Sequence, residues 1–258
     1  MRRLNRHLAG AGFAGALLLT SGAAVAGAAD DWQYAGTIYL WGAGINAETA
    51  RGSTVDIDFN TLVNNLNMAF MGAIEARRRE WSLVADVTYL NVGGDDQGSV
   101  AVPVAPDSPL LVDVDADVKA RAWILNLHGA YNLLASERAS LDVLAGARYL
   151  ELKIDFGLDL SAAPGQITVR RSVSDNVWDG VVGVKGRVNL ADRWYLPYYA
   201  DVGTGQSDLT WQVFAGVAYS FDWGEMALVY RRAEWEFDDK RLDNLQVSGP
   251  AAAVTWHF

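Results

Sequence analysis

Cysteine is absent from the whole sequence, which excludes a disulfide framework and a lipoprotein anchor attached to a cysteine. Long hydrophobic runs are absent after the first thirty residues, where no run approaches the ~18 apolar residues of a transmembrane helix. Basic residues are in short supply, with 21 lysines and arginines against 31 aspartates and glutamates, and this balance argues against a nucleic-acid partner. Stability must therefore come from pairing and burial, without cross-links.

The amino-terminal segment has the features of an export signal. It begins with three arginines within six residues, continues as an apolar run over 8–19, and ends in small residues. This order predicts a secretory signal peptide over residues 1–28, with cleavage after Ala28 or alternatively after Ala26. The mature domain, residues 29–258, then carries a formal net charge of −13, because the three arginines leave with the signal.

The mature chain is rich in aromatic residues, since all ten tryptophans of the sequence lie in it. An exported chain with this excess and no helical span is expected to enter a bilayer by strands. The alternative, a soluble β-sandwich, would hold its large aromatics in mid-strand, whereas here they fall at the ends of predicted strands. We expect an inner girdle of Tyr34, Trp81, Tyr131, Trp194, Tyr219, Phe221, Trp256 and Phe258, and an outer girdle of Trp41, Tyr89, Tyr149, Trp178 and Trp211.

Two-residue alternation divides the mature chain into strands. In residues 209–221, for example, the odd-numbered positions form an apolar stripe and the even-numbered ones are mostly small or polar. Tight turns alternate strictly with longer connections, as they do in outer-membrane barrels with short periplasmic turns. The predicted strands are 32–46, 66–78, 81–92, 115–134, 140–156, 176–190, 193–203, 209–221, 225–237 and 245–258.

The sequence therefore predicts an all-β fold, a transmembrane antiparallel up-and-down β-barrel of ten strands, with eight strands as the alternative. Hydrocarbon offers no hydrogen-bond partners, so the sheet must close and leave no edge. Within the first long connection, residues 54–59 predict a short extra strand and 60–66 a single helical turn. The proline-containing connection 93–114 is expected to be irregular.

The carboxy terminus carries the most specific pattern. Val254, Trp256 and Phe258 alternate on one face of the last strand, and the chain ends on that aromatic residue. Together with the signal, the alternation and the aromatic girdles, this ending resembles the proteobacterial outer-membrane β-barrel superfamily, with its OmpA-like and OmpW-like small barrels. The resemblance implies that the last strand is the signal read by the outer-membrane assembly machinery. It also implies a Gram-negative outer-membrane location and contacts with periplasmic chaperones, outer-membrane lipids and lipopolysaccharide.

Alternation also predicts which charged side chains face the lumen. The predicted set is Glu75, Arg77, Asp86, His128, Asp142, Arg148, Asp179, Lys185, Arg187 and Asp201, with Asn126 among them and either Arg231 or Arg232 added. Acids and bases are similar in number, and isolated buried ions are costly, so we expect them to pair and plug a narrow barrel. The alternative is a narrow, porin-like passive channel that selects small solutes by charge.

The sequence offers little for catalysis or for metal or cofactor binding. Some outer-membrane barrels are proteases or lipid-A-modifying enzymes, and the pairs Asp95-Asp96 and Asp238-Asp239 supply carboxylates at the outer rim. No predicted outer loop contains a histidine that could act beside them. The alternating acids Asp113, Asp115 and Asp117 favour a solvated rim over a calcium site. We therefore expect a structural or surface barrel with no enzymatic activity and no cofactor.

Overall fold

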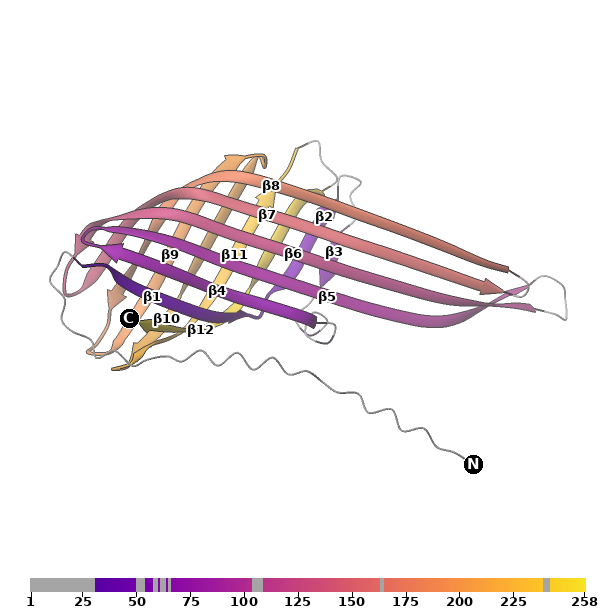
Figure 1. The fold of residues 1–258 in the computed structure, drawn as a ribbon, viewed down its shortest axis with the longest axis horizontal. Coiled ribbons are helices and arrows are strands. Elements are labelled where there is room, and N and C mark those ends of the chain that lie inside the picture. The colour runs from indigo at the N-terminus through magenta and orange to yellow at the C-terminus, as the bar shows by residue number, and fades with distance from the viewer. Residues whose placement is uncertain are drawn as a thin grey trace, which may run out of the picture.

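The computed structural model describes residues 31–49, 54–57, 60, 64, 66–103, 109–162, 165–238 and 242–258. The predicted signal peptide lies outside these residues. The strands are β1 (Gln33–Trp41), β2 (Gly44–Thr49), β3 (Thr54–Ile57), β4 (Leu66–Arg78), β5 (Trp81–Pro103), β6 (Pro109–Ala135), β7 (Ala139–Ala162), β8 (Gly165–Asn189), β9 (Trp194–Gly205), β10 (Leu209–Ser220), β11 (Gly224–Glu236) and β12 (Leu242–His257) (Figure 1). Among the described residues, no helix combines the length and hydrophobicity that a bilayer crossing requires.

Ten of these strands close into an antiparallel barrel. Each of β4 to β12 pairs with its neighbour in sequence, β4 pairs back to β1, and β1 pairs with β12 from Ala35↔His257 to Trp41↔Ala251. The last strand therefore lies beside the first and removes the open edge that hydrocarbon does not tolerate. The predicted ten-stranded barrel is confirmed, and both the eight-stranded alternative and the sandwich are wrong.

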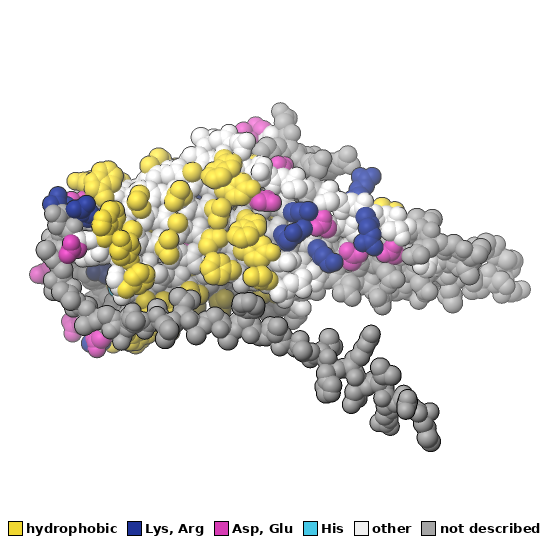
Figure 2. All heavy atoms as spheres, in the orientation of Figure 1, with side chains coloured by type: hydrophobic (Ala, Val, Ile, Leu, Met, Phe, Trp, Pro, Cys, Tyr) yellow, Lys and Arg dark blue, Asp and Glu magenta, His cyan; other side chains and the backbone are white. Residues whose placement is uncertain are grey.

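The outer wall of the barrel is apolar. Outward-facing side chains such as Leu40, Leu83, Leu127 and Leu228 are more than half exposed. In Figure 2 the hydrophobic side chains cover the wall between two zones that carry charged side chains. A contiguous apolar surface on this scale is stable only against hydrocarbon, so the barrel is an integral membrane protein.

Aromatic pairs lie at both borders of this belt. Ring contacts at the inner border are Tyr34–Phe258, Trp81–Tyr131, Trp194–Tyr219 and Trp223–Trp256, and those at the outer border are Tyr89–Trp123 and Tyr149–Trp178. One predicted member of the outer girdle is wrong. Trp41 is buried and faces the lumen, because it shares the parity of Tyr39 rather than that of the exposed Leu40.

Four strands extend far beyond the outer girdle. Strands β5 to β8 continue as a paired sheet up to Pro103↔Pro109 and Ala162↔Gly165, and they project past the other strands (Figure 1). The expectation that 93–114 is an irregular loop is therefore wrong, as is the placement of 157–175 in a connection. Pro103 and Pro109 lie together at the outer end of the β5–β6 pairing, and the valines and short side chains on the inner side of them favour an extended ladder.

The first predicted strand is interrupted. Residues 32–46 form β1 and β2, separated at Gly42 and Ala43, and both pieces pair with β12. The predicted short strand is present as β3, which pairs with β2. The predicted helical turn at 60–66 falls mostly outside the described residues, and Leu66 already begins β4.

Deletion of Phe258 tests the closing seam. Its backbone exchanges two hydrogen bonds of 3.0 Å with Tyr34, and the two rings stack with centroids 6.1 Å apart. We expect the deletion to lower the yield of folded barrel in outer-membrane fractions, measured as heat-modifiable migration in cold detergent gels. The substitution Trp81→Ala is the control, since it removes an exposed girdle ring whose ring contact is Tyr131 on β6, away from the seam. A normal yield of the deletion variant would contradict the role given to the terminal residue.

Candidate functional site: the interior of the barrel

Arg148 on β7 and Asp201 on β9, the two neighbours of β8, form an ion pair inside the lumen, and neither side chain is exposed to any extent. The Arg148 guanidinium also donates to Asn126 Oδ1 at 2.8 Å and to Thr210 Oγ1 at 3.0 Å. Asp201 in addition accepts the hydroxyl of Tyr199. Burying both charges is costly, and these added hydrogen bonds are what make the pair tolerable.

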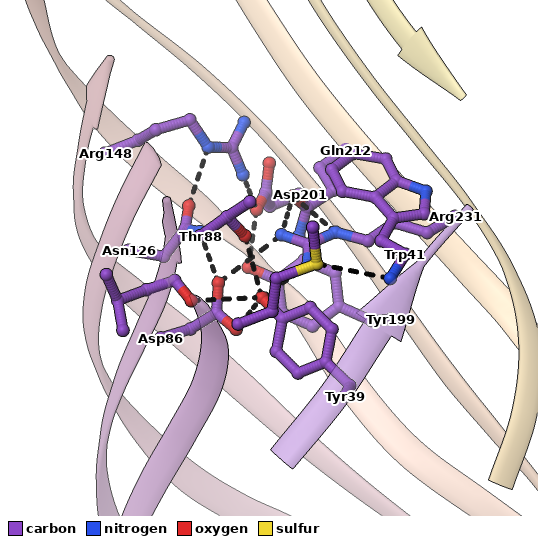
Figure 3. Close-up of polar contacts among 12 residues, drawn as sticks. Tyr39, Trp41, Asp86, Thr88, Asn126, Arg148, Tyr199, Asp201, Gln212 and Arg231 are labelled. Atoms are coloured by element: carbon purple, nitrogen blue, oxygen red, sulfur yellow. Dashed lines mark hydrogen bonds and ion pairs between the residues drawn. The ribbon is translucent and has the colours of Figure 1, made fainter. Parts of the chain in front are cut away.

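A second buried arginine lies beside the first pair. Arg231 on β11 donates to Gln212 Oε1 at 2.8 Å and to Tyr39 Oη at 3.0 Å, and it lies 3.4 Å from Asp86 Oδ1. Tyr39 itself donates to Asp86 Oδ2 at 2.8 Å. Strands that are distant in the sequence thus meet in the middle of the barrel (Figure 3).

Asn126 joins the two arginine centres. Its amide nitrogen donates to Asp86 Oδ1 at 2.9 Å, while its oxygen accepts from Arg148. The chain Arg148–Asn126–Asp86–Arg231 therefore crosses the lumen as one network, which we call the mid-lumen network. Because each partner holds the next in place, the polar side chains are fixed across the cross-section of the barrel.

An apolar layer lies on the outer side of this network. Trp41, Trp235, Ile124, Leu150, Val177, Phe237 and Leu245 are buried and belong to one contiguous cluster. Aromatic rings contact the arginines from this layer, since the Arg231 guanidinium lies 4.5 Å from the ring centroid of Trp41 and that of Arg148 lies 5.7 Å from that of Trp235. The outer half of the lumen is therefore lined by hydrocarbon side chains.

A second set of charges lines the inner side. Arg77 contacts Asp142 at 2.6 Å and Glu75 at 3.1 Å, and Lys185 contacts Glu75 at 3.0 Å. Glu75 and Arg77 of this set line a hollow of about 670 Å³ at the inner mouth, which His257 and Glu225 also line. Its lining comes from the inner ends of the strands, so the hollow is a vestibule at the inner mouth.

The structure brings together most of the predicted lumen residues but not all of them. Glu75, Arg77 and Lys185 meet Asp142 near the inner mouth, while Asp86, Arg148 and Asp201 belong to the mid-lumen network. Asp179 stands apart, since it is buried at an outer turn, where it accepts the backbone N–H of Ser207 at 2.8 Å. Arg187 lies half-exposed at the inner rim, 3.7 Å from Glu225.

His128 is buried in the lumen, and within the described part of the chain neither ring nitrogen has a hydrogen-bond partner. Its nearest aromatic contact is Tyr199, with ring centroids 6.0 Å apart. No described carboxylate or hydroxyl hydrogen-bonds to the ring in the way that general-base catalysis requires. No described group of three acids or histidines could hold a metal ion. Some of the predicted rim acids have side chains outside the described part of the structure, namely Asp95, Asp96, Asp113, Asp115 and Asp239.

The terminal residues Val254, Trp256 and Phe258 face outward, and the two aromatic rings lie at the inner girdle. Sequence alternation did not decide between Arg231 and Arg232, and in the structure Arg231 faces the lumen. Arg232 points outward over the ring of Trp211, with its guanidinium 5.0 Å from the centroid. The sequence reasoning missed Tyr39, Tyr199, Thr210, Gln212 and Trp235, all of which the alternation of their own strands would have placed inside.

Comparison with known proteins gives a likeness of architecture. No family model and no curated protein matches the sequence. Among solved structures, the outer membrane protease OmpT from Escherichia coli is 12% identical over 88% of this chain and 97% of that one, with a TM-score of 0.49. The attachment invasion locus protein Ail of Yersinia pestis is 11% identical over 89% and 99%, with a TM-score of 0.37. The Pseudomonas putida toluene transporter TodX is 8% identical over 88% of each chain, with a TM-score of 0.30.

The names of these neighbours state different activities, and no activity is carried over to this chain. The apolar belt, the two girdles, the closed ladder and the projecting strands describe an integral barrel of the outer membrane.

Replacing Arg148 by methionine tests the buried ion pair. The variant leaves the Asp201 carboxylate buried without its cation, so we expect the free energy of unfolding to fall by about 3–5 kcal/mol. Denaturant titration of protein refolded into lipid vesicles measures it. The control is Arg121→Met, because Arg121 and Asp155 form an exposed ion pair at 3.2 Å. Loss of this pair should leave the free energy of unfolding nearly unchanged. Equal stability of the two variants would contradict the importance of the buried pair.

Proposed function

We propose that this protein is a structural and surface barrel of the outer membrane, without enzymatic activity, whose lumen is sealed by its own side chains. The observation that carries the proposal is the mid-lumen network, in which two buried arginines and their partners span the barrel interior from β1 to β11. An ion crossing this layer would have to displace charged groups that are held by several hydrogen bonds each.

The apolar layer supports the same conclusion from the outer side. The cavity among Leu150, Val177 and Phe237 has a volume of about 30 Å³, which is room for roughly two water molecules. Its lining offers few polar groups to replace the hydration of an ion. A solute entering from outside would therefore meet a hydrophobic barrier before it reached the arginines.

The surface role is supported by the projecting sheet of β5 to β8. Its described part carries ion pairs between neighbouring strands, including Arg121–Asp155 at 3.2 Å and Arg170–Asp159 at 3.4 Å. A hydrogen bond from Ser172 lowers the pKa of Asp155, and the positive charges of Lys153 and Arg121 act in the same direction. This charged sheet continues the strand pairing beyond the outer girdle and presents a face to the exterior.

Biogenesis follows the usual route in this proposal. The signal over residues 1–28 is cleaved after Ala28 or Ala26, periplasmic chaperones carry the chain, and the assembly machinery reads Val254, Trp256 and Phe258. Outer-membrane lipids contact the belt, and lipopolysaccharide surrounds the outer girdle.

Planar-bilayer recording tests the sealed lumen. Refolded protein should insert and give no steady single-channel current, because the network and the apolar layer close the lumen in series. Heat-modifiable migration of protein recovered from the bilayer lipid distinguishes a silent barrel from one that failed to insert. A steady conductance that changes when Lys185 is replaced by alanine would favour the narrow channel and overturn the seal.

Lipid-A analysis tests the absence of enzymatic activity. Overexpression should leave the lipid-A mass spectrum unchanged, because His128 has no acid or nucleophile hydrogen-bonded to it. A new lipid-A species that disappears in the His128→Ala variant would revive the enzyme. The matched control is His257→Ala, which removes a histidine at the inner rim.

A further inference from the structure

The barrel wall is not hydrogen-bonded along its whole height between β1 and β4. These strands pair only from Gln33↔Arg77 to Ile38↔Gly72. Beyond Ile38, the rest of β1 and then β2 pair with β12. The described residues 66–71 of β4 pair with β5 alone. The seam therefore opens in the outer half of the membrane-spanning wall.

The backbone at the opening is satisfied in an unusual way. The N–H of Trp41 donates to Sδ of Met71 at 3.2 Å, in place of a carbonyl on the neighbouring strand. Sulfur is a weak acceptor. Within hydrocarbon, a backbone that leaves the ladder is tolerated only where protein or a cavity borders it.

A cavity of about 260 Å³ borders this seam. It runs from Leu40 and Leu66 at the wall to Ala122 and Ile124 inside, above a floor at Thr88. Its polar side-chain atoms are already engaged, since Thr88 bonds to the Tyr39 hydroxyl at 2.8 Å and the Trp41 ring N–H donates to the carbonyl of Gly249 at 3.3 Å. Nothing in the described lining is left to hold water, and an apolar cavity of this kind stays dry.

The seam is flanked on the outer wall by hydrocarbon side chains. Leu40 on one side is 71% exposed, and Met68 and Phe70 on the other side are 57% and 52% exposed. Phe70 is level with Tyr89 and Trp123 through the strand register, which places the seam just at the outer girdle. The seam therefore meets the outer border of the acyl-chain region, at the level of the outer aromatic girdle.

We propose that the cavity is a binding site for one hydrocarbon chain of a membrane lipid, which enters between β1 and β4. An engineered apolar cavity of ~150 Å³ already accepts benzene, so this one has room for a segment of acyl chain. An acyl chain that enters moves from one hydrocarbon environment to another, so it loses no hydration. It also makes dispersion contacts with the cavity lining, which an empty cavity lacks. The Thr88–Tyr39 contact and the mid-lumen network below it end the site, so the chain is held and not passed through.

Photo-crosslinking in proteoliposomes tests the site directly. The probe is a phosphatidylcholine with a diazirine near the end of one acyl chain, and mass spectrometry locates the modified residues. We expect modification at inward-facing Ala122, Ile124 or Met71 in addition to Leu40 and Phe70 on the belt. Leu144 is the internal control, because it is buried and inward-facing but belongs to a separate cluster from the one around this cavity.

Filling the cavity should abolish the interior modification and leave the belt unchanged. Ala122→Trp is the first variant, and Ala69→Phe is the second in case the first does not fold, as judged by heat-modifiable migration. Leu127→Trp is the matched control, because it places the same ring on the same strand β6 but on the exposed outer face.

Modification of the belt without modification of the interior in the wild-type protein would overturn the proposal, and so would interior modification that survives a folded filling variant. Loss of the interior modification as the protein-to-lipid ratio of the vesicles rises would show that a second copy occupies the seam instead. A conducting lumen would contradict the proposed seal but would leave these cross-linking results unaffected, so the two proposals fail separately.

Discussion

The bilayer offers no hydrogen-bond partner to a peptide group, and this constraint shapes the whole molecule. Every N–H and carbonyl within the hydrocarbon must find its partner inside the wall, so the strands close on themselves through the pairing of β1 with β12. Closure fixes the alternation of side chains. One face of each strand meets lipid and the other meets a narrow interior that the chain must fill itself.

Water is scarce in that interior, so the charged side chains there must be paired with other groups of the protein. Arg148 and Arg231 are each surrounded by hydrogen-bond acceptors from several strands, so neither charge is isolated. The aromatic rings of Trp41 and Trp235 complete their surroundings on the outer side. A network of this kind specifies strand register as well as filling space, because a slip of one residue would turn Arg148 toward lipid.

The sequence predicted the strand count, the closing strand and the side on which most charges lie, because period-two alternation is a local signal that survives without knowledge of partners. It did not predict the projecting sheet, since Gly93-Gly94 and the prolines in 93–114 suggested a loop while the pairing of β5 with β6 continues past them. It also placed Trp41 in the girdle from its position near a strand end, although its own parity puts it inside. Contacts such as Arg148–Asp201 were beyond reach, because which inward residues meet depends on strand stagger and tilt.

The mid-lumen network connects the two arginine centres, and a double-mutant cycle between them tests this connection most directly. The free energies of unfolding of Arg148→Met, Arg231→Met and the double variant would be measured in the same lipid vesicles. Because Asn126 and Asp86 link the two centres, the effects should be non-additive, with a coupling of about 0.5–3 kcal/mol. Additivity to within about 0.5 kcal/mol would show two independent ion pairs and would contradict a single network across the lumen.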